Sequence, residues 1–294
     1  MTPESSNPDC LVAEGLHKTY GAFTLGALSL KVPAGKAVGV IGSNGAGKTT
    51  LLAGLAGQLS FDRGTVSWAG QSVTRRAWKY KQQVSYCRDV PALYGDLTVR
   101  QTLSFVARCQ PTWRVDRAQQ LLDLFRLEPD KRVKELSRGM KAKLSLLLGI
   151  SHDVRLLLLD EVTAGVDPDT RDEVQRSLRR LARDRGVAVV MSSHIFEDLE
   201  QVSDDVLILR NGAPAFVGSM ERIKDMSVVV LAPGVARTVE AERGVVGAWD
   251  VPDGRALLVS PQPNEHVQQA AHRSHAALRP ASLRDLYFAF RDQS

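Results

Sequence analysis

The sequence predicts an α/β fold, and three observations carry that prediction. An apolar run at residues 37–41 leads directly into a glycine-rich loop at residues 42–50, and another apolar run follows, which is the order strand, loop, helix. Two more short apolar runs, residues 156–159 and 187–191, are typical of parallel strands buried on both faces. Residues 90–150, between these strands, have helical periodicity instead and predict a helical insert.

Short segments on both sides of the loop predict an antiparallel β-subdomain near the N-terminus. Strands are expected within residues 11–32, with turns at Gly15 and Gly21, and within residues 60–75. A further strand is expected at residues 84–87, before the helical insert.

Helices are expected in and after the insert. Their expected ranges are residues 98–109 with Thr98 as N-cap, residues 116–127, a helix beginning at Ser137, and residues 169–185. After the last buried strand, an Asn211-Gly212 pair between apolar segments predicts a β-hairpin.

The character of the chain changes after residue 222. Short strands are expected at residues 228–231, 245–251 and 256–259, and helices at residues 264–277 and 282–290. We therefore expect a main domain over residues 1–220 and a small α+β accessory domain over residues 221–294, which we expect to support dimerisation.

Composition limits the class of protein. The net charge of +5 fits anionic partners, such as a nucleotide or a membrane surface, and fits an ordinary mildly basic protein equally well. Three cysteines without a C-x-x-C pair favour a reducing compartment over a disulfide framework. The N-terminus lacks the pattern of a secretory signal, and no apolar run approaches the roughly 20 residues that span a bilayer. Any membrane role is therefore expected to come through a partner.

The glycine-rich loop matches the phosphate-binding pattern G-x-x-x-x-G-K-[ST]. Such loops aim successive backbone N–H groups into one concavity, and the following helix adds its positive dipole end. Lys48 is expected to reach the β- and γ-phosphates of a nucleotide, and the Thr49 hydroxyl to bind Mg²⁺. The predicted nucleotide-binding residues of the loop are Gly42, Ser43, Asn44, Gly45, Ala46, Gly47, Lys48, Thr49 and Thr50.

Two acids end the buried strand at residues 156–159. Asp160 is placed to hold Mg²⁺ in a nucleotide site, and Glu161, one step further out, to polarise an attacking water molecule. The alternative is an exposed acidic strand end without chemistry.

One more segment carries a resemblance to a family. Leu136-Ser137-Arg138-Gly139-Met140 resembles the signature motif of ABC-type ATPases, which usually have Leu-Ser-Gly-Gly-Gln, and it lies at the family's distance before the acidic strand end. The resemblance covers residues 10–220. It implies an ABC ATPase, a P-loop NTPase core with an N-terminal antiparallel β-subdomain and a helical subdomain at about residues 90–150.

The resemblance also implies further site residues. Tyr20 resembles the aromatic residue that stacks on adenine, Asp167 the D-loop residue, and His194 the switch histidine. Ser137 and Gly139 would face the γ-phosphate of ATP bound by a second subunit. The family carries glutamine where this sequence has Asp89, which is a candidate ligand for Mg²⁺ or water.

The altered signature, Asp89 and the C-terminal extension together resemble ATPase subunits of bacterial ABC-2-type exporters. That implies ATP and Mg²⁺ as cofactors, Glu161, His194 and Lys48 as catalytic residues, and a homodimer or heterodimer of ATPase subunits. The partners would be membrane-spanning permease subunits at the cytoplasmic face of the bacterial inner membrane.

Two alternatives stay open. One is a soluble ABC ATPase that acts on nucleic acid or ribosomes, although the arginines of residues 169–185 alternate with acids and no long basic run occurs, so nucleic acid is not expected. The other is an ATP-binding regulatory module with little turnover, which Asp89 and Arg138 keep open.

Overall fold

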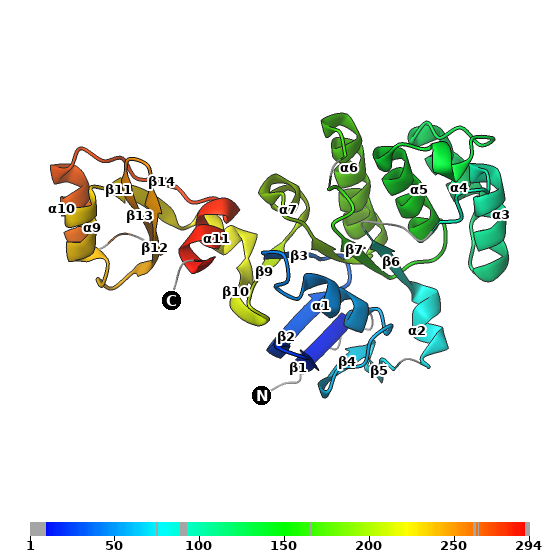
Figure 1. Ribbon diagram of the computed structural model, residues 1–294, viewed down its shortest axis with the longest axis horizontal. Coiled ribbons are helices and arrows are strands. Elements are labelled where there is room, and N and C mark those ends of the chain that lie inside the picture. The colour runs from blue at the N-terminus through cyan, green and yellow to red at the C-terminus, as the bar shows by residue number, and fades with distance from the viewer. Residues whose placement is uncertain are drawn as a thin grey trace.

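A computed structural model describes residues 10–74, 76–88, 93–164, 166–260, 263 and 265–291. The chain forms a central sheet with helices on both sides, an N-terminal sheet beside it, and helical and α+β units at opposite ends of the molecule (Figure 1). The predicted α/β fold with an antiparallel N-terminal sheet is confirmed.

The N-terminal sheet is antiparallel. It has the order β2-β1-β4-β5, with β1 at Cys10–Tyr20, β2 at Phe23–Pro33, β4 at Arg63–Trp68 and β5 at Gln71–Ser72. The predicted turn at Gly21 joins β1 to β2, but the predicted turn at Gly15 is wrong. Gly15 lies inside β1, where a φ of +58° coincides with a register shift between Ala13 and Leu16. A bulge uses the same glycine conformation as a turn, so the residue type does not distinguish them.

The central sheet has the order β10-β9-β3-β8-β7-β6. Its parallel strands are β3 at Ala37–Gly42, β6 at Val84–Arg88, β7 at Leu156–Asp160, β8 at Ala188–Ser192 and β9 at Asp205–Arg210. The edge strand β10, Ala213–Ser219, pairs antiparallel with β9 through the predicted Asn211-Gly212 turn, where both residues have positive φ. The carboxyl ends of the parallel strands therefore meet at one edge.

Apolar side chains fill both faces of this sheet. Leu157 and Leu159 of β7 belong to the cluster packed under the helices, whereas Leu156 and Leu158 belong to the cluster shared with the N-terminal sheet. Successive residues of a strand point to opposite faces, so an unbroken leucine run supplies both cores.

The helices divide into core and insert. The core has α1 at Lys48–Leu55, α2 at Trp78–Gln83, α6 at Pro168–Arg185 and α7 at Phe196–Val202. The insert has α3 at Val99–Cys109, α4 at Val115–Leu124, a 3₁₀ turn at Val133–Glu135 and α5 at Arg138–Ile150. The predicted N-cap of α3 is present, because Thr98 and Gln101 form reciprocal side-chain bonds to each other's backbone N–H.

The C-terminal residues form a second antiparallel sheet of order β12-β13-β11-β14. The strands are β11 at Ser227–Leu231, β12 at Val245–Val251, β13 at Gly254–Val259 and β14 at Arg279–Pro280. The helices of this region are α8 at Met220–Lys224, α9 at Pro233–Val239, α10 at Glu265–Arg273 and α11 at Leu283–Arg291.

Helix α11 runs back from this sheet to the core (Figure 1). The Tyr287 ring lies 5.4 Å from that of Phe196 at the start of α7, and the backbone N–H of Leu283 donates to Glu200 of the same helix at 2.7 Å. The C-terminal helix is thus attached to the segment that follows β8.

Candidate functional site

The glycine-rich loop joins the end of β3 to the start of α1. Gly47 is the N-cap of α1 with a φ of +104°, and a Cβ there would lie 3.0 Å from the Phe23 ring and 2.9 Å from Leu25. Only glycine combines that backbone conformation with so close an approach. The loop therefore turns tightly onto the N-terminus of α1, whose first N–H groups have no partner within the helix.

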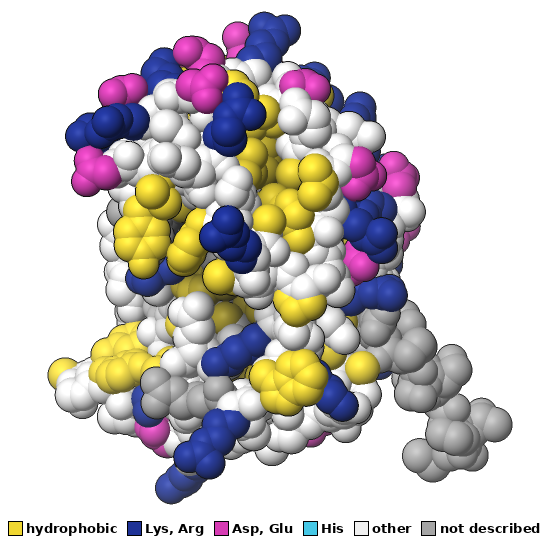
Figure 2. All heavy atoms as spheres, turned by 90° about the vertical axis from the view of Figure 1, so that its right-hand side faces the viewer, with side chains coloured by type: hydrophobic (Ala, Val, Ile, Leu, Met, Phe, Trp, Pro, Cys, Tyr) yellow, Lys and Arg dark blue, Asp and Glu magenta, His cyan; other side chains and the backbone are white. Residues whose placement is uncertain are grey.

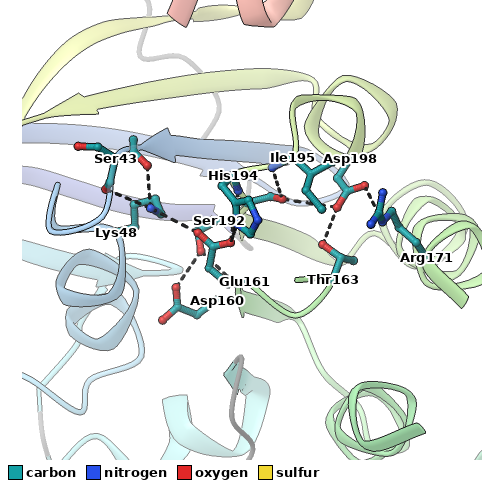
Figure 3. Close-up of polar contacts among 12 residues, drawn as sticks. Ser43, Lys48, Asp160, Glu161, Thr163, Arg171, Ser192, His194, Ile195 and Asp198 are labelled. Atoms are coloured by element: carbon teal, nitrogen blue, oxygen red, sulfur yellow. Dashed lines mark hydrogen bonds and ion pairs between the residues drawn. The ribbon is translucent and has the colours of Figure 1, made fainter. Parts of the chain in front are cut away.

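Lys48 is buried beneath the loop. Its Nζ donates to the backbone oxygens of Gly42 at 2.8 Å and Ser43 at 3.3 Å, and it lies 3.3 Å from Oε1 of Glu161. The ammonium group is thus held across the mouth of the loop by interactions that an anionic ligand could replace (Figure 3).

Asp160 is the buried last residue of β7. Its Oδ1 accepts a hydrogen bond from Ser192 at 2.8 Å, and its Oδ2 accepts one from the Tyr86 hydroxyl at 3.2 Å. Burial and the adjacent Asp160 carboxylate raise the pKa of Tyr86, so Tyr86 stays a donor. These bonds fix the carboxylate at the strand end.

Glu161 lies between Lys48 and His194. Its Oε2 is 2.5 Å from His194 Nδ1 and 3.3 Å from the His194 backbone N, while Oε1 faces Lys48. Its backbone has a φ of +55°, which is uncommon for a side chain of this size and is typical of functional sites. Its N–H donates to the Ser192 carbonyl at 3.1 Å, so β8 holds this conformation.

The signature segment begins α5. Ser137 is the N-cap, and its Oγ accepts from Met140 N at 3.2 Å. A Cβ on Gly139 would lie 3.3 Å from the carboxylate of Asp167, so the two segments pack together. Asp167 in turn caps α6 by accepting from Thr170 N at 2.9 Å, and this bond lowers the pKa of Asp167.

A cavity of about 740 Å³ opens over the loop. Its described lining residues are Phe23, Ser43, Asn44, Gly45, Ala46, Gly47, Lys48, Thr49, Thr50, Arg138, Glu161, Ala164 and His194. The structure therefore brings the predicted loop residues together with Glu161 and His194. Its size is that of a site for a small organic ligand.

Sequence reasoning missed Phe23 and Arg138 as lining residues. Tyr20 lies outside this lining, with 47% of its surface exposed at the end of β1, directly opposite Phe23 in the strand pairing. The signal available for Phe23 was a second aromatic residue just across the Gly21 turn.

The other predicted residues lie outside the described lining of the cavity. Ser137, Gly139 and Asp167 form one group at the start of α5 and α6, and Asp160 is bonded to Ser192 at the end of β8. Asp89 falls outside the described residues.

Oxygen atoms suited to Mg²⁺ are present on Thr49 and Asp160. Among the described residues, no group of three or more His, Cys, Asp or Glu side chains could hold a metal ion. This donor set fits Mg²⁺, which usually keeps several waters and binds through one or two carboxylates together with substrate phosphates. Thr49 and Asp160 therefore fit a Mg²⁺ ion that binds together with a nucleotide.

Comparisons with known proteins agree with this site. A family described as "ABC transporter" matches residues 25–164. The uncharacterized ABC transporter ATP-binding protein YhaQ of Bacillus subtilis is 28% identical over 88% of this chain and 88% of its own length. The Nod factor export ATP-binding protein I of Ralstonia nicotianae is 32% identical over 71% of this chain and 67% of its own.

A solved structure described as the ATP-binding subunit of an ABC transporter superposes with a TM-score of 0.67 at 27% identity, covering 73% of this chain and 91% of that one. Within the part of the chain that the structure describes, no helix is long and apolar enough to cross a membrane.

Proposed function

Since the chain belongs to the ABC transporter family as an ATP-hydrolysing subunit, we propose that two copies close around ATP to drive export through separate membrane-spanning subunits. The observation that carries the proposal is the contact chain Lys48–Glu161–His194 at the edge of the loop cavity. It supports the proposal because it brings a cation, a carboxylate and an imidazole together at the lining of that cavity.

The loop binds the nucleotide in this proposal. Backbone N–H groups of the loop and the start of α1 surround the phosphates, and Lys48 exchanges its carbonyl partners for phosphate oxygens. Tyr20 stacks on the adenine ring. Thr49 and Asp160 would hold Mg²⁺, with Asp89 as a further candidate ligand, and the ion would supply charge neutralisation on the phosphates.

Glu161 and His194 act on the reacting end. Once Lys48 turns to the phosphate, one oxygen of Glu161 becomes available to accept a proton from the attacking water, and His194 holds the other. Phosphoryl transfer needs positioning and charge stabilisation more than covalent chemistry, and in this proposal Glu161, His194 and Lys48 would supply both.

The second copy completes the cage. Ser137 and Gly139 of one subunit would meet the γ-phosphate bound by the other, with the N-terminus of α5 supplying N–H groups and its dipole. A different ATPase subunit in place of the second copy remains the alternative. The name of the Ralstonia relative supports export as the direction of transport.

Exposed aromatic side chains support a docking surface for the membrane-spanning partner. Trp78 on α2, Tyr94 before α3 and Phe105 on α3 are each about half exposed or more, and the Tyr94 and Phe105 rings lie 5.8 Å apart. Figure 2 shows hydrophobic side chains gathered on this face with basic ones between them. Docking here would hold the subunit at the cytoplasmic face of the inner membrane.

Replacing Glu161 by Gln tests the proposal. The amide keeps the shape but cannot take a proton, so ATP should still bind and hold a stable dimer while turnover falls by about 100-fold or more. Glu240→Gln is the matched control, because Glu240 pairs with Arg255 in the C-terminal sheet. Unchanged turnover in Glu161→Gln would refute the role given to Glu161.

A further inference from the structure

Asp198 is a buried charge that the proposed mechanism does not use. It lies on the first turn of α7, four residues after His194, and its side chain is fully buried. A carboxylate without water is costly unless donors surround it, and burial raises the pKa of Asp198 accordingly. The segments that supply the surrounding donors therefore indicate which parts of the chain the Asp198 carboxylate holds together.

Four side chains from three segments face this carboxylate. Figure 3 labels two of them, Thr163 and Arg171. Oδ2 accepts from the Thr163 hydroxyl at 2.5 Å and from the Ser193 hydroxyl at 3.5 Å. Oδ1 accepts from Gln175 Nε2 at 2.6 Å and lies 3.7 Å from Nε of Arg171.

Each segment adjoins a residue of the site. Thr163 follows Glu161 by two positions, and Ser193 directly precedes His194. Arg171 also donates to the carbonyl of Val166, next to Asp167. One buried carboxylate thus joins the turn after β7, the turn after β8 and the start of α6.

The hydrogen bond from Ser193 to Asp198 holds the residue that directly precedes His194. The Ser193 Oγ accepts from Ile195 N at 3.0 Å, which shapes the turn that carries His194. That turn brings Nδ1 and the backbone N of His194 onto Oε2 of Glu161.

We propose that Asp198 is a positioning residue that holds Glu161, Asp167 and His194 in one arrangement and supports hydrolysis through the Glu161–His194 contact. The inference rests on the proposed roles of Glu161 and His194. It concerns the reacting end of the site and not the loop, so nucleotide affinity should not depend on Asp198.

The test compares Asp198→Ala with Asp198→Asn in the purified full-length chain. A displacement of the histidine turn should lower kcat for ATP hydrolysis on the order of 10- to 100-fold in Asp198→Ala and leave KM within about threefold. Asp198→Asn keeps the shape and one acceptor oxygen for Gln175, and its amide can donate to the Thr163 and Ser193 hydroxyls. It should therefore retain more of kcat than Asp198→Ala, and a fall in kcat below the wild type remains measurable in it where the alanine variant does not fold. A control for the loss of a buried carboxylate is Asp285→Ala, which removes the partner of Arg279 and Ser282. It should keep kcat.

A double-mutant cycle identifies the path of the effect. If Asp198 acts through His194, Asp198→Ala should add less than about twofold to the loss already caused by His194→Ala. Full additivity, a rise in KM with unchanged kcat, or an equal loss in Asp285→Ala would each overturn the inference. Wild-type turnover in His194→Ala and Glu161→Gln would instead refute the proposed function.

Discussion

Glu161 is held by neighbours on both sides and by a backbone conformation that few side chains adopt. A non-glycine residue at a φ of +55° stores strain of about 1–3 kcal/mol, which the surrounding structure must offset. Here the offsetting contacts are those to Ser192, Lys48 and His194. The carboxylate is therefore directed into the cavity before any ligand arrives, which reduces the reorganisation needed during reaction.

Tyr20 and Phe23 are the two candidates for stacking on the proposed adenine ring, and a pair of variants distinguishes them. Tyr20 presents an exposed ring with Lys18 Nζ 5.3 Å from its centre, whereas Phe23 packs against Gly47 at the loop. One base–aromatic stack contributes about 1–3 kcal/mol of binding free energy. We therefore expect Tyr20→Ala to weaken ATP binding by roughly 5- to 150-fold.

Calorimetric titration with a non-hydrolysable ATP analogue measures this, and Tyr20→Phe should bind as the wild type does. If Tyr20→Ala binds normally and Phe23→Leu does not, adenine stacks on Phe23 instead.

His152 makes folding stability depend on pH. It is buried after α5, with Nε2 2.7 Å from Ser85 Oγ, and burial lowers its pKa below the ordinary 6.5. Below about pH 6.5 the unfolded chain takes up a proton that the folded chain does not, so the unfolded state binds more protons and the free energy of unfolding decreases as the pH is lowered.

We expect His152→Gln to lose less stability than the wild type between about pH 7.5 and about pH 5.5, measured by urea unfolding. The exposed His272→Gln should keep the wild-type slope. An equal slope in His152→Gln would contradict this account.

Strongly patterned helices and strands were predictable, including short strands such as β6 and β11, whereas the short helices α7 and α9 were not. The leucine run of β7 and the capped start of α3 follow from local sequence. Helix α9 was missed because Pro233-Gly234 indicates a turn, although proline is tolerated in the first turn of a helix. Helix α7 has seven residues and is fixed by Asp198 and α11, contacts that only the folded chain reveals.

The same division applies to the site. Loop residues adjacent in sequence could be located from the motif, since their function depends on local backbone shape. The approach of Phe23 and Arg138 to the cavity, and the group around Asp198, depend on packing between distant segments. No local pattern encodes these.

Two helices with similar N-caps allow the role of Ser137 to be separated from helix stability. Ser137 caps α5 and Thr98 caps α3, each by accepting from a backbone N–H at 3.2 Å and 3.1 Å respectively. Replacing either by Ala should cost about 1 kcal/mol of unfolding free energy. Only Ser137→Ala should also weaken the ATP-bound dimer, because in the proposed dimer the γ-phosphate bound by one subunit meets the start of α5 of the other.

Gel filtration with ATP in the Glu161→Gln background measures the fraction of dimer. Chemical denaturation measures the loss of unfolding free energy in each variant. Equal dimer populations in the two variants would remove Ser137 from the composite site.

At the scale of the whole molecule, one apolar cluster runs from the central sheet into the C-terminal sheet. It includes Ile41 of β3 and Leu157 of β7 together with Met220, Leu258 and Leu286. A smaller cluster lies on the other face of the C-terminal sheet under α9 and α10. The C-terminal region, residues 221–291, thus shares its main core with the preceding domain. Helix α11 packs against α7 where the two regions meet.

A shared core predicts that both regions unfold together. Scanning calorimetry should show one transition, because opening the C-terminal sheet would expose the cluster that also stabilises α7. A non-hydrolysable ATP analogue with Mg²⁺, at a concentration of about 100 times its Kd, adds about 2.7 kcal/mol to the free energy of unfolding. It should therefore raise the midpoint temperature of the whole transition by roughly 5 °C. A second transition that the nucleotide leaves in place would show that the C-terminal sheet folds independently. Coupled unfolding would mean that substitutions that loosen the core of the C-terminal sheet lower the stability of the whole chain.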